Sequence, residues 1–253
     1  MNLLTEIKVL TALRITIAKR NPIFLIMGLA TPILYLTLFM PILKNLSSVS
    51  EHYHGNLLTY FVPGMLPIIA FSTGIFTGFG MINEVRSGIL ERLKVTPASR
   101  FSILSGPVLF DTCAMLFNSL LFTLIAIPFG FRAHLLGMGV LFVLLSFLTL
   151  ITSSIGNALA VCLKSHDRYA PIVHGINLPV LLLSGTLLPI AIAPLWLKII
   201  AHLNPVFYVV EASRALAVGN FSSPSVFLAC IILTSFAALS LSWATKVFKS
   251  IAA

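Results

Sequence analysis

The acidic and histidine side chains are the first candidates for chemistry in this chain, and their placement argues against catalysis. No acidic pair is set up for acid–base work; Asp111 is expected to start a helix at the membrane interface, and His174 to be a packed neutral imidazole. The chain lacks both a G-x-x-x-x-G-K-[ST] phosphate loop and a G-x-S-x-G turn. We therefore expect no catalytic, cofactor-binding or metal-binding residues. All acidic residues lie near the ends of apolar runs or between them: Glu6, Glu51, Glu84, Glu91, Asp111, Asp167 and Glu211.

Segment 84–100 has the pattern of a short amphipathic helix between two apolar runs. Val85, Ile89 and Leu93 recur at four-residue spacing and form one apolar stripe among charged side chains. Pro97 is expected to stop this helix and Ser99 to cap the next one. Such a helix suits the docking of a cytoplasmic protein. It suits equally a solvated connector whose charges only fix the topology.

Segment 191–220 combines a short apolar stretch with a charged pair. The stretch 191–203 has 13 residues and is bounded by Pro194 and Pro205, so it is too short to cross a membrane. We expect re-entrant helices here that dip into the outer leaflet, rather than a seventh span. Glu211 and Arg214, spaced i,i+3, are expected to form an ion pair near the membrane. A structural role and a gating role are both open for this pair.

Six long apolar stretches dominate the rest of the chain. Of its 253 residues, 58% are hydrophobic and 9% charged, and the mean hydropathy is +1.04. A bilayer core about 30 Å thick takes about 20 helical residues to cross, and almost all lysines and arginines fall between the stretches. The sequence therefore predicts a single all-α transmembrane domain over residues 1–253. Its six spans are predicted at 22–43, 57–83, 107–131, 135–163, 169–190 and 225–247.

The distribution of positive charge predicts the orientation. Twelve of the 16 lysines and arginines fall on one side of these spans and four on the other, which places both termini in the cytoplasm. No basic run is longer than Lys19-Arg20, so the net charge of +9 indicates anionic lipid rather than nucleic acid as the partner. Residues 1–20 are expected to form an amphipathic helix on the cytoplasmic membrane surface, although Glu6 and Arg14 lie within its apolar arc. A disordered basic tail is the alternative.

Small residues mark one face of the second span. Gly74 and Gly78 are four residues apart, and Gly80 follows them. This spacing lets another helix approach closely, because no side chain separates the two backbones. The partner helix is expected either in the same chain or in a second copy.

Two motifs together resemble those of a known family. The run E-x-R-x-G-x-L-E-x-L-x-V-T-P-x-S-R over residues 84–100 is similar to the loop between spans two and three of ABC type-2 permeases, the membrane subunits of exporters. The run N-P-x-x-Y-x-x-E-x-x-R over residues 204–214 resembles the element before the last span of the same family. Among its subfamilies the chain looks most like the daunorubicin-resistance-type drug exporter permeases.

The resemblance implies partners and roles that the spacing alone does not give. Two copies of a separate ABC ATPase subunit would bind ATP and Mg²⁺ and would drive a pair of permeases, made of this chain with a second copy of itself or with a related chain. The complex would lie in a bacterial plasma (inner) membrane. The residues that couple to the ATPase would be Glu84, Arg86, Gly88, Glu91, Arg92, Thr96 and Pro97. The re-entrant element that closes the outer side would contain Pro194, Pro205, Tyr208, Glu211 and Arg214.

The expected function is therefore that of a permease subunit in an ATP-driven exporter of a drug-like, lipid or other amphipathic substrate. Substrate would pass between the two copies, along spans one, two and five. An export permease for polysaccharide or lipid-linked glycan shares the same plan and is the first alternative. A stand-alone secondary carrier is disfavoured because no acidic pair is buried at membrane depth, and no residue cluster supports a membrane enzyme.

Overall fold

The computed structural model describes residues 3–20, 30, 32–38, 57–89, 92, 99–186, 190 and 193–250. Within these ranges the chain is helical and contains no strand, so the all-α class is confirmed. A short 3₁₀ turn, η1 (Ile127–Phe129), follows one of the long helices. The α-helices are α1 (Leu3–Arg20), α3 (Leu57–Phe76), α4 (Gly78–Arg86), α6 (Arg100–Ala126), α7 (Leu135–Leu163), α8 (His166–Leu183), α9 (Leu195–His202), α10 (Pro205–Ala217) and α11 (Pro224–Ser250).

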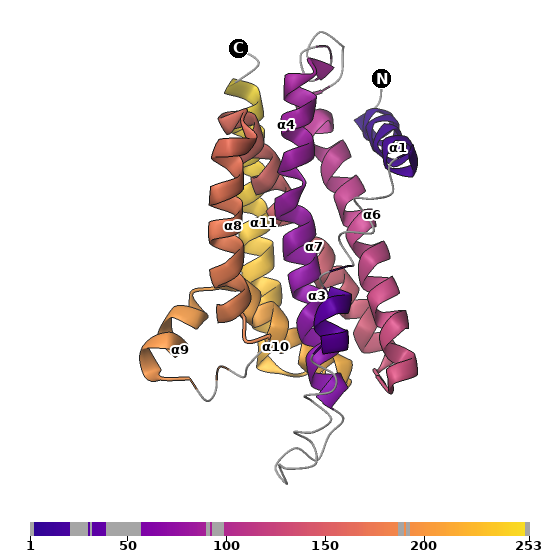
Figure 1. Ribbon diagram of the computed structural model, residues 1–253, viewed down its shortest axis with the longest axis vertical. Helices are drawn as coiled ribbons and strands as arrows, with labels where there is room; N and C mark the ends of the chain where they lie inside the picture. Colours follow the sequence, from indigo (N-terminus) through magenta and orange to yellow (C-terminus); the bar gives the residue numbers. More distant parts are fainter. Residues whose placement is uncertain are drawn as a thin grey trace.

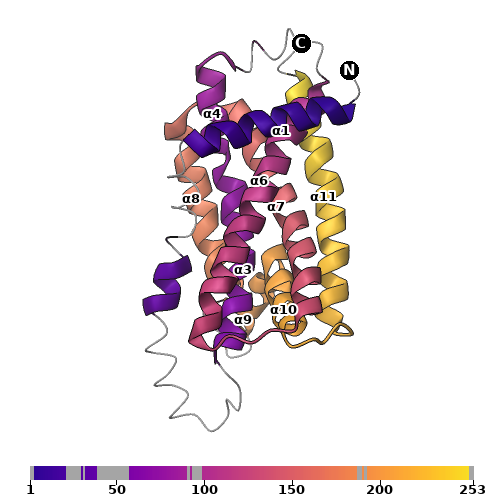
Figure 2. The ribbon, with the colours of Figure 1, turned by 90° about the vertical axis from the view of Figure 1, so that its right-hand side faces the viewer.

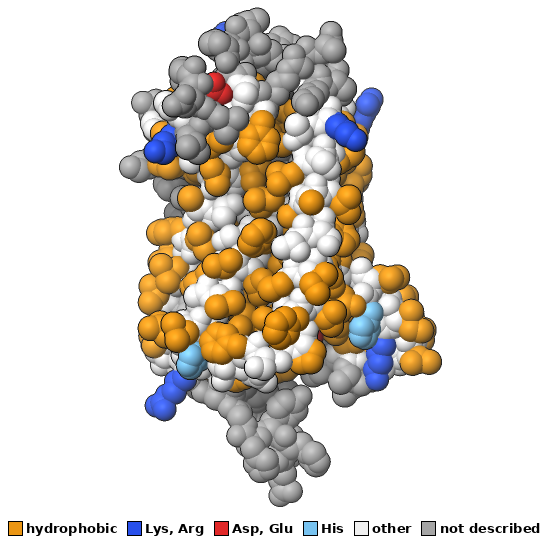
Figure 3. Space-filling model, turned by 180° about the vertical axis from the view of Figure 1, so that it is seen from behind, with side chains coloured by type: hydrophobic (Ala, Val, Ile, Leu, Met, Phe, Trp, Pro, Cys, Tyr) orange, Lys and Arg blue, Asp and Glu red, His pale blue; other side chains and the backbone are white. Residues whose placement is uncertain are grey.

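Four helical segments are long and apolar enough to cross a membrane: Leu58–Arg86, Phe101–Phe129, Leu135–Leu163 and Pro224–Phe248. They run side by side along the long axis of the molecule (Figure 1). Apolar side chains cover the middle of the face seen in Figure 3, and lysines and arginines lie toward its ends. The chain is therefore a membrane protein with several spanning helices.

The other two predicted spans differ from these four. Most of predicted span 22–43 lies outside the described residues. The residues of this span that the structure describes, 30 and 32–38, are helical. Helix α8 covers most of predicted span 169–190, but it has 18 residues and contains Pro171 and Pro179. Its length corresponds to about 27 Å at about 1.5 Å per residue, slightly less than a typical bilayer core.

Helix α7 is the centre of the bundle and contacts α3, α4, α6, α10 and α11. Its approach to α3 and α4 depends on glycines. A Cβ built on Gly74 would lie 2.8 Å from the Ser153 backbone nitrogen, and one built on Gly156 would lie 2.9 Å from the Ile75 carbonyl oxygen. The close partner of the Gly74–Gly78 face is thus α7 of the same chain.

Tyr169 of α8 fills the space that these glycines leave. Its side chain is buried, and its hydroxyl donates a hydrogen bond to the Ile75 carbonyl at 2.6 Å. A Cβ on Gly78 would collide with this hydroxyl. Because α3 and α4 meet at Thr77, the Tyr169 hydroxyl satisfies a backbone oxygen next to the junction.

Two short helices lie across opposite ends of the bundle. Helix α1 crosses the end that also holds the last turns of α11, and it packs on α6 (Figure 2). Helix α10 lies at the other end and contacts α3, α7 and α11. We refer to these as the α1 end and the α10 end. Described residues of the first sequence motif, 84–100, lie at the α1 end, and the second motif, 204–214, lies at the α10 end.

Helix α6 begins earlier than predicted span 107–131. Ser99 is its N-cap, and the Ser99 hydroxyl accepts a hydrogen bond from the Ser102 backbone N–H at 3.1 Å, so the predicted cap is confirmed. The expectation that Asp111 starts a helix is wrong, because Asp111 lies eleven residues after the first residue, Arg100. At about 1.5 Å per residue this is about 16 Å into the helix.

Candidate functional site

An ion pair joins α1 to the last turn of α4. The Arg14 guanidinium lies 2.7 Å from the Glu84 carboxylate, and the two side chains are 13% and 19% exposed. The residues are 70 positions apart in sequence, so the contact is tertiary. Glu84 is thus engaged within its own chain by α1.

A second carboxylate of α1 binds the start of α6. Glu6 accepts hydrogen bonds from the Ser99 backbone N–H at 2.9 Å and from the Ser102 hydroxyl at 2.8 Å. The first N–H groups of a helix have no partner within it, and the helix dipole favours a negative charge there. The bond from the Ser99 N–H, followed by that from Ser102, holds the pKa of Glu6 below its ordinary value.

These two contacts attach both ends of segment 84–100 to a single helix. Glu84 opens the segment and binds Arg14, whereas Ser99 near its close binds Glu6. Between the two anchors, Leu10 of α1 packs on Gly106 of α6, where an added Cβ would lie 2.6 Å from the Leu10 Cβ. A displacement of segment 84–100 would therefore also displace α1, α4 and α6.

The remaining predicted coupling residues occupy different environments. Arg86 is exposed at the end of α4, with its Nε 3.5 Å from the Lys164 carbonyl oxygen, and Arg92 is exposed. Gly88 has φ of +72°, a left-handed conformation that glycine adopts without strain, and its N–H donates to the Val85 carbonyl at 3.2 Å. The other three predicted coupling residues lie outside the described ranges: Glu91, Thr96 and Pro97.

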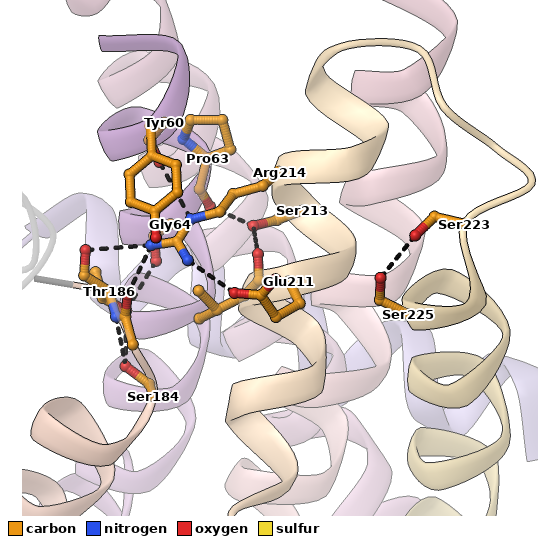
Figure 4. A network of polar contacts seen from close by, with 12 residues as sticks. Tyr60, Pro63, Gly64, Ser184, Thr186, Glu211, Ser213, Arg214, Ser223 and Ser225 are labelled. Carbon is orange, nitrogen blue, oxygen red and sulfur yellow. Dashed lines mark hydrogen bonds and ion pairs between the residues drawn. The ribbon is translucent and has the colours of Figure 1, made fainter. Parts of the chain in front are cut away.

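Arg214 is the centre of the network at the α10 end (Figure 4). Its side chain is 9% exposed and forms the predicted ion pair with Glu211 at 2.9 Å. Its other terminal nitrogen donates to the Gly185 carbonyl at 2.7 Å and lies 3.4 Å from the Thr186 carbonyl. Helix α8 ends just before these carbonyls, so the cation is placed at the negative end of the α8 dipole.

The same guanidinium packs on α3. Its Cζ lies 3.6 Å from the centre of the Tyr60 ring, within the range of a cation–π contact. Gly64 makes room for it, since a Cβ there would lie 3.2 Å from the Arg214 Nη2. Arg214 thus holds α3, the end of α8 and α10 in one cluster.

Ser213 compensates for a missing helix hydrogen bond in α3. Pro67 has no N–H, so the Pro63 carbonyl one turn earlier has no partner within the helix. The Ser213 hydroxyl lies 2.8 Å from this oxygen and 2.7 Å from the Val210 carbonyl of its own helix. The loss in α3 is therefore repaired by α10, which ties the two helices at the position of the proline.

The other predicted residues of the α10 end shape the α9–α10 turn. Pro205 is the first residue of α10, where its missing N–H costs nothing, and Pro194 precedes α9. The Tyr208 hydroxyl donates to the His202 carbonyl at the end of α9 at 3.0 Å. Asn204 caps α10 through the Val206 N–H at 3.0 Å and donates to the Val180 carbonyl of α8 at 3.1 Å.

Sequence reasoning missed several of these contacts. Glu6 and Arg14 were expected only as defects in the apolar arc of α1, yet they make its attachments to α4 and α6. Ser213 had no assigned role, although a hydroxyl next to Arg214 and two prolines in α3 were visible signals. The two charged residues that interrupt the apolar arc of α1 are thus the ones that contact other helices.

The fold and the two end clusters define a helical membrane protein whose surface helix holds a loop between two spans. Comparison with known proteins identifies the family within this class. The sequence profile of the ABC-2 type transporter family matches residues 5–218. The chain therefore belongs to the ABC-2 type transporter family, whose members are membrane permeases that work with an ATPase subunit in ABC transporters.

Individual relatives cover most of the chain. The ycf38 protein of Cyanophora paradoxa, whose name describes a transport permease, is 33% identical over 204 residues, which is 78% of this chain and 69% of that protein. The daunorubicin resistance ABC transporter permease protein DrrB1 of Streptomyces coeruleorubidus is 24% identical over 80% of this chain and 71% of its own length. A Mycobacterium tuberculosis protein, DrrC, named for doxorubicin resistance, is 26% identical over 79% and 72%.

Proposed function

We propose that this chain is the transmembrane permease subunit of an ATP-driven exporter, which moves a drug-like, lipid or other amphipathic substrate out of the cytoplasm or inner leaflet. The observation that carries the proposal is the attachment of both ends of segment 84–100 to α1, through Arg14–Glu84 and Glu6–Ser99. The names of the DrrB1 and DrrC relatives support a drug-like substrate.

The physical argument concerns how an ATPase could act on the bundle. A partner shifts a protein between two states only through contacts that differ between those states. Segment 84–100 connects α4 and α6, and α1 links the same two helices at its two carboxylate contacts. A push on the segment would therefore move two membrane helices as a unit, rather than bend a free loop.

We assign the coupling role to Glu84, Arg86, Gly88, Glu91, Arg92, Thr96 and Pro97, with Glu84 acting as an internal anchor. The α10 end would close the outer side of the pathway, with Arg214 as its central residue. In this proposal the chain crosses the bacterial inner membrane six times. The α1 end faces the cytoplasm, and both termini are cytoplasmic. The location of α1 and the last turns of α11 at one end supports an even number of crossings (Figure 1).

The proposed complex contains two copies of this chain and two ATPase subunits. The chain itself would bind neither ATP nor Mg²⁺, which would sit on the ATPase. Exposed apolar side chains along α8, including Ile172, Ile176, Leu178 and Leu182, leave a surface for lipid, substrate or a second copy. Two copies would place such surfaces on either side of a shared pathway.

The test uses the chain together with its ATPase partner in inside-out membrane vesicles, with daunorubicin fluorescence reporting accumulation. We expect ATP-dependent uptake that Gly88→Pro lowers at least tenfold, because proline cannot adopt a φ of +72° and lacks the N–H that binds Val85. Glu91→Ala, in the same segment, is expected to weaken co-purification of the ATPase.

Gly80→Ala is the matched control, since an added Cβ at Gly80 has no atom within 4 Å. This variant is expected to keep full uptake. Equal ATPase stimulation in Gly88→Pro and Gly80→Ala would contradict the docking role. ATP-independent transport by liposomes that contain this chain alone would contradict the whole proposal.

A further inference from the structure

A buried acid lies between the membrane helices, away from both end clusters. Asp111 of α6 is 2% exposed, and its carboxyl oxygen accepts a hydrogen bond from the Ser153 hydroxyl of α7 at 2.5 Å. The Asn157 side-chain amide, one turn further along α7, donates to the same Ser153 oxygen at 3.1 Å. The Thr77 side chain of the α3–α4 junction lies beside the carboxyl group. Three packed elements therefore meet around one acid.

Among the described residues, no charged group on the surrounding elements forms a salt bridge with Asp111, although the charge of Arg14 acts on it and favours the ionised form. Arg14 of α1 binds Glu84, and Glu6 of α1 binds Ser99 and Ser102. The Tyr169 hydroxyl of α8 donates to the Ile75 carbonyl. The remaining such groups on α1, α4, α7 and α11 whose side chains the structure describes are exposed: Lys8, Arg86, Cys162, Cys230 and Lys246. Within the described residues, no cation pairs with Asp111.

An ionised carboxylate in this position would be costly. Burial of an unpaired charge in a protein interior or a bilayer costs several kcal/mol, whereas binding a proton removes the charge. The hydrogen-bond inventory points the same way. The Asn157 side-chain oxygen is buried and has no partner among the described residues, so the cluster contains an acceptor without a donor. A protonated carboxyl group would add one donor, whereas an ionised one would add only acceptors.

We propose that Asp111 is a neutral carboxylic acid, and that it forms an exchangeable proton-binding site between α6 and α7 together with Ser153 and Asn157. The ligand is a proton and not a metal ion. The Asp111 and Ser153 oxygens are in direct contact, which leaves no space for an ion between them. No group of three His, Cys, Asp or Glu side chains suited to a metal occurs within the described ranges.

The site has a consequence beyond the proposed transport role. Helix α6 binds α1 at its first turn, next to segment 84–100, and binds α7 at Asp111. The proton on Asp111 would therefore stabilise the contact between the middle of α6 and α7. Loss of the proton would leave a charge between α6 and α7 and would weaken their packing. Rearrangement of α6 and release of the proton are therefore expected to be coupled.

The first experiment labels the acid in native membranes that contain the full-length chain. Dicyclohexylcarbodiimide is apolar and reacts with protonated carboxyl groups. The acid proton goes to a carbodiimide nitrogen, a carboxyl oxygen bonds to the central carbon, and the acyl group then moves to nitrogen without a leaving group. Mass spectrometry is expected to find this adduct on Asp111, decreasing as pH rises, and to find none in Asp111→Asn.

The second experiment measures unfolding of the purified chain in lipid nanodiscs as a function of pH. If Asp111 holds a proton in the folded chain and loses it on unfolding, the folded state binds more protons and its stability falls as pH rises. The expected fall is up to tenfold in the folding equilibrium constant per pH unit. Asp111→Asn resembles the neutral acid, so it should fold and should lose this slope.

Ser153→Ala is the companion variant, because it removes a partner of the acid but keeps the acid itself. We expect lower stability at every pH with the pH slope retained. The proposal would be overturned by an unchanged slope in Asp111→Asn, or by failure of this variant to fold. It would equally be overturned if sodium, compared with choline, stabilised the wild-type chain and not Asp111→Asn, since the site would then bind a cation.

Discussion

The two ends of the bundle are both held by an arginine and a glutamate, but in different ways. At the α1 end, Arg14 and Glu84 join separate helices and are each partly exposed, at 13% and 19%. At the α10 end, Arg214 and Glu211 lie on the same helix, and the guanidinium also binds backbone carbonyls of the α8 end. The first pair is a contact between elements, whereas the second is part of a buried cluster.

The difference indicates which end can rearrange at low cost. The Arg14–Glu84 pair keeps some access to solvent, so both charges can be rehydrated when it opens and salt weakens it more than a fully buried pair. A guanidinium buried against carbonyl groups cannot leave without exposing unsatisfied oxygens, each of which costs about 1–3 kcal/mol. The α1 end is therefore suited to repeated movement and the α10 end to a fixed geometry. Four sets of variants separate these two behaviours.

Arg214→Ala is expected to have the largest effect. Loss of the guanidinium leaves the Gly185 carbonyl without its charged donor and removes the contact with Tyr60, so the free energy of unfolding should fall by about 3 kcal/mol. Thermal unfolding in nanodiscs measures this, and export is expected to fail as well. Glu211→Gln is the control and should cost less than about 1 kcal/mol, because the Glu211 side chain is 43% exposed. Equal losses would show that only the ion pair matters.

Ser213→Ala tests the repair of the proline in α3. The Pro63 carbonyl would lose its donor, which is expected to cost about 1–2 kcal/mol of unfolding free energy. In a Pro67→Ala background the helix regains an N–H for that carbonyl, so the same change should cost about 1 kcal/mol less. Thermal unfolding of the four chains in this cycle gives the coupling directly. If the unfolding free energies of the two changes were fully additive, Ser213 would not act through the Pro63 carbonyl.

Charge reversal tests the contact at the α1 end. Arg14→Glu and Glu84→Arg each bring like charges together, and each is expected to detach α1 at a cost of about 1 kcal/mol. Hydrogen exchange of residues 5–16 should rise in both variants, and ATPase stimulation should fall. The double reversal restores the pair and should recover both signals. Failure of the double variant to recover either one would argue against a direct pair.

Glu6→Gln has the smallest expected effect, and pH reveals it. The folded pKa of Glu6 is lowered, mainly by the Ser99 N–H, so its contribution is present above its ordinary pKa and is lost as pH falls through the lowered value. Protection of α1 from hydrogen exchange should therefore decline in the wild-type chain as the pH falls below the ordinary glutamate pKa of 4.5. In Glu6→Gln it should be lower near neutral pH and independent of pH in that range. A parallel decline in the variant would assign the effect to another group.

The sequence predicted the elements better than their contacts. Apolar runs and charge-free stretches identified the four segments that are long and apolar enough to cross a membrane, because the bilayer constrains length and composition strongly. The Ser99 cap gives the start of α6 correctly, but the predicted span 107–131 begins later, since the first six residues of the helix include Arg100, Ser102 and Ser105 and do not look apolar. This error placed Asp111 at the interface, whereas Ser153 and Asn157, spaced i,i+4 on α7, were a sign of a polar partner. Tertiary hydrogen bonds of this kind depend on helix rotation, which periodicity alone does not fix.

The residues of the α10 end show the same limit. The Glu211–Arg214 pair could be predicted because both residues lie on one helix at adjacent turns. The partners of Arg214 on α3 and after α8 could not, because they are backbone carbonyls and a glycine, which carry no sequence signal for a cation. Local pairs are thus accessible from sequence, and long-range backbone contacts are not.

Helix α1 and the last turns of α11 lie at the same end of the bundle (Figure 2). A domain fused ahead of α1 or behind α11 would therefore arrive on one common side without any additional crossing. Two chains could likewise be genetically joined tail to head by a linker at that end. Such a tandem would keep two copies together and would allow each half to diverge independently in sequence.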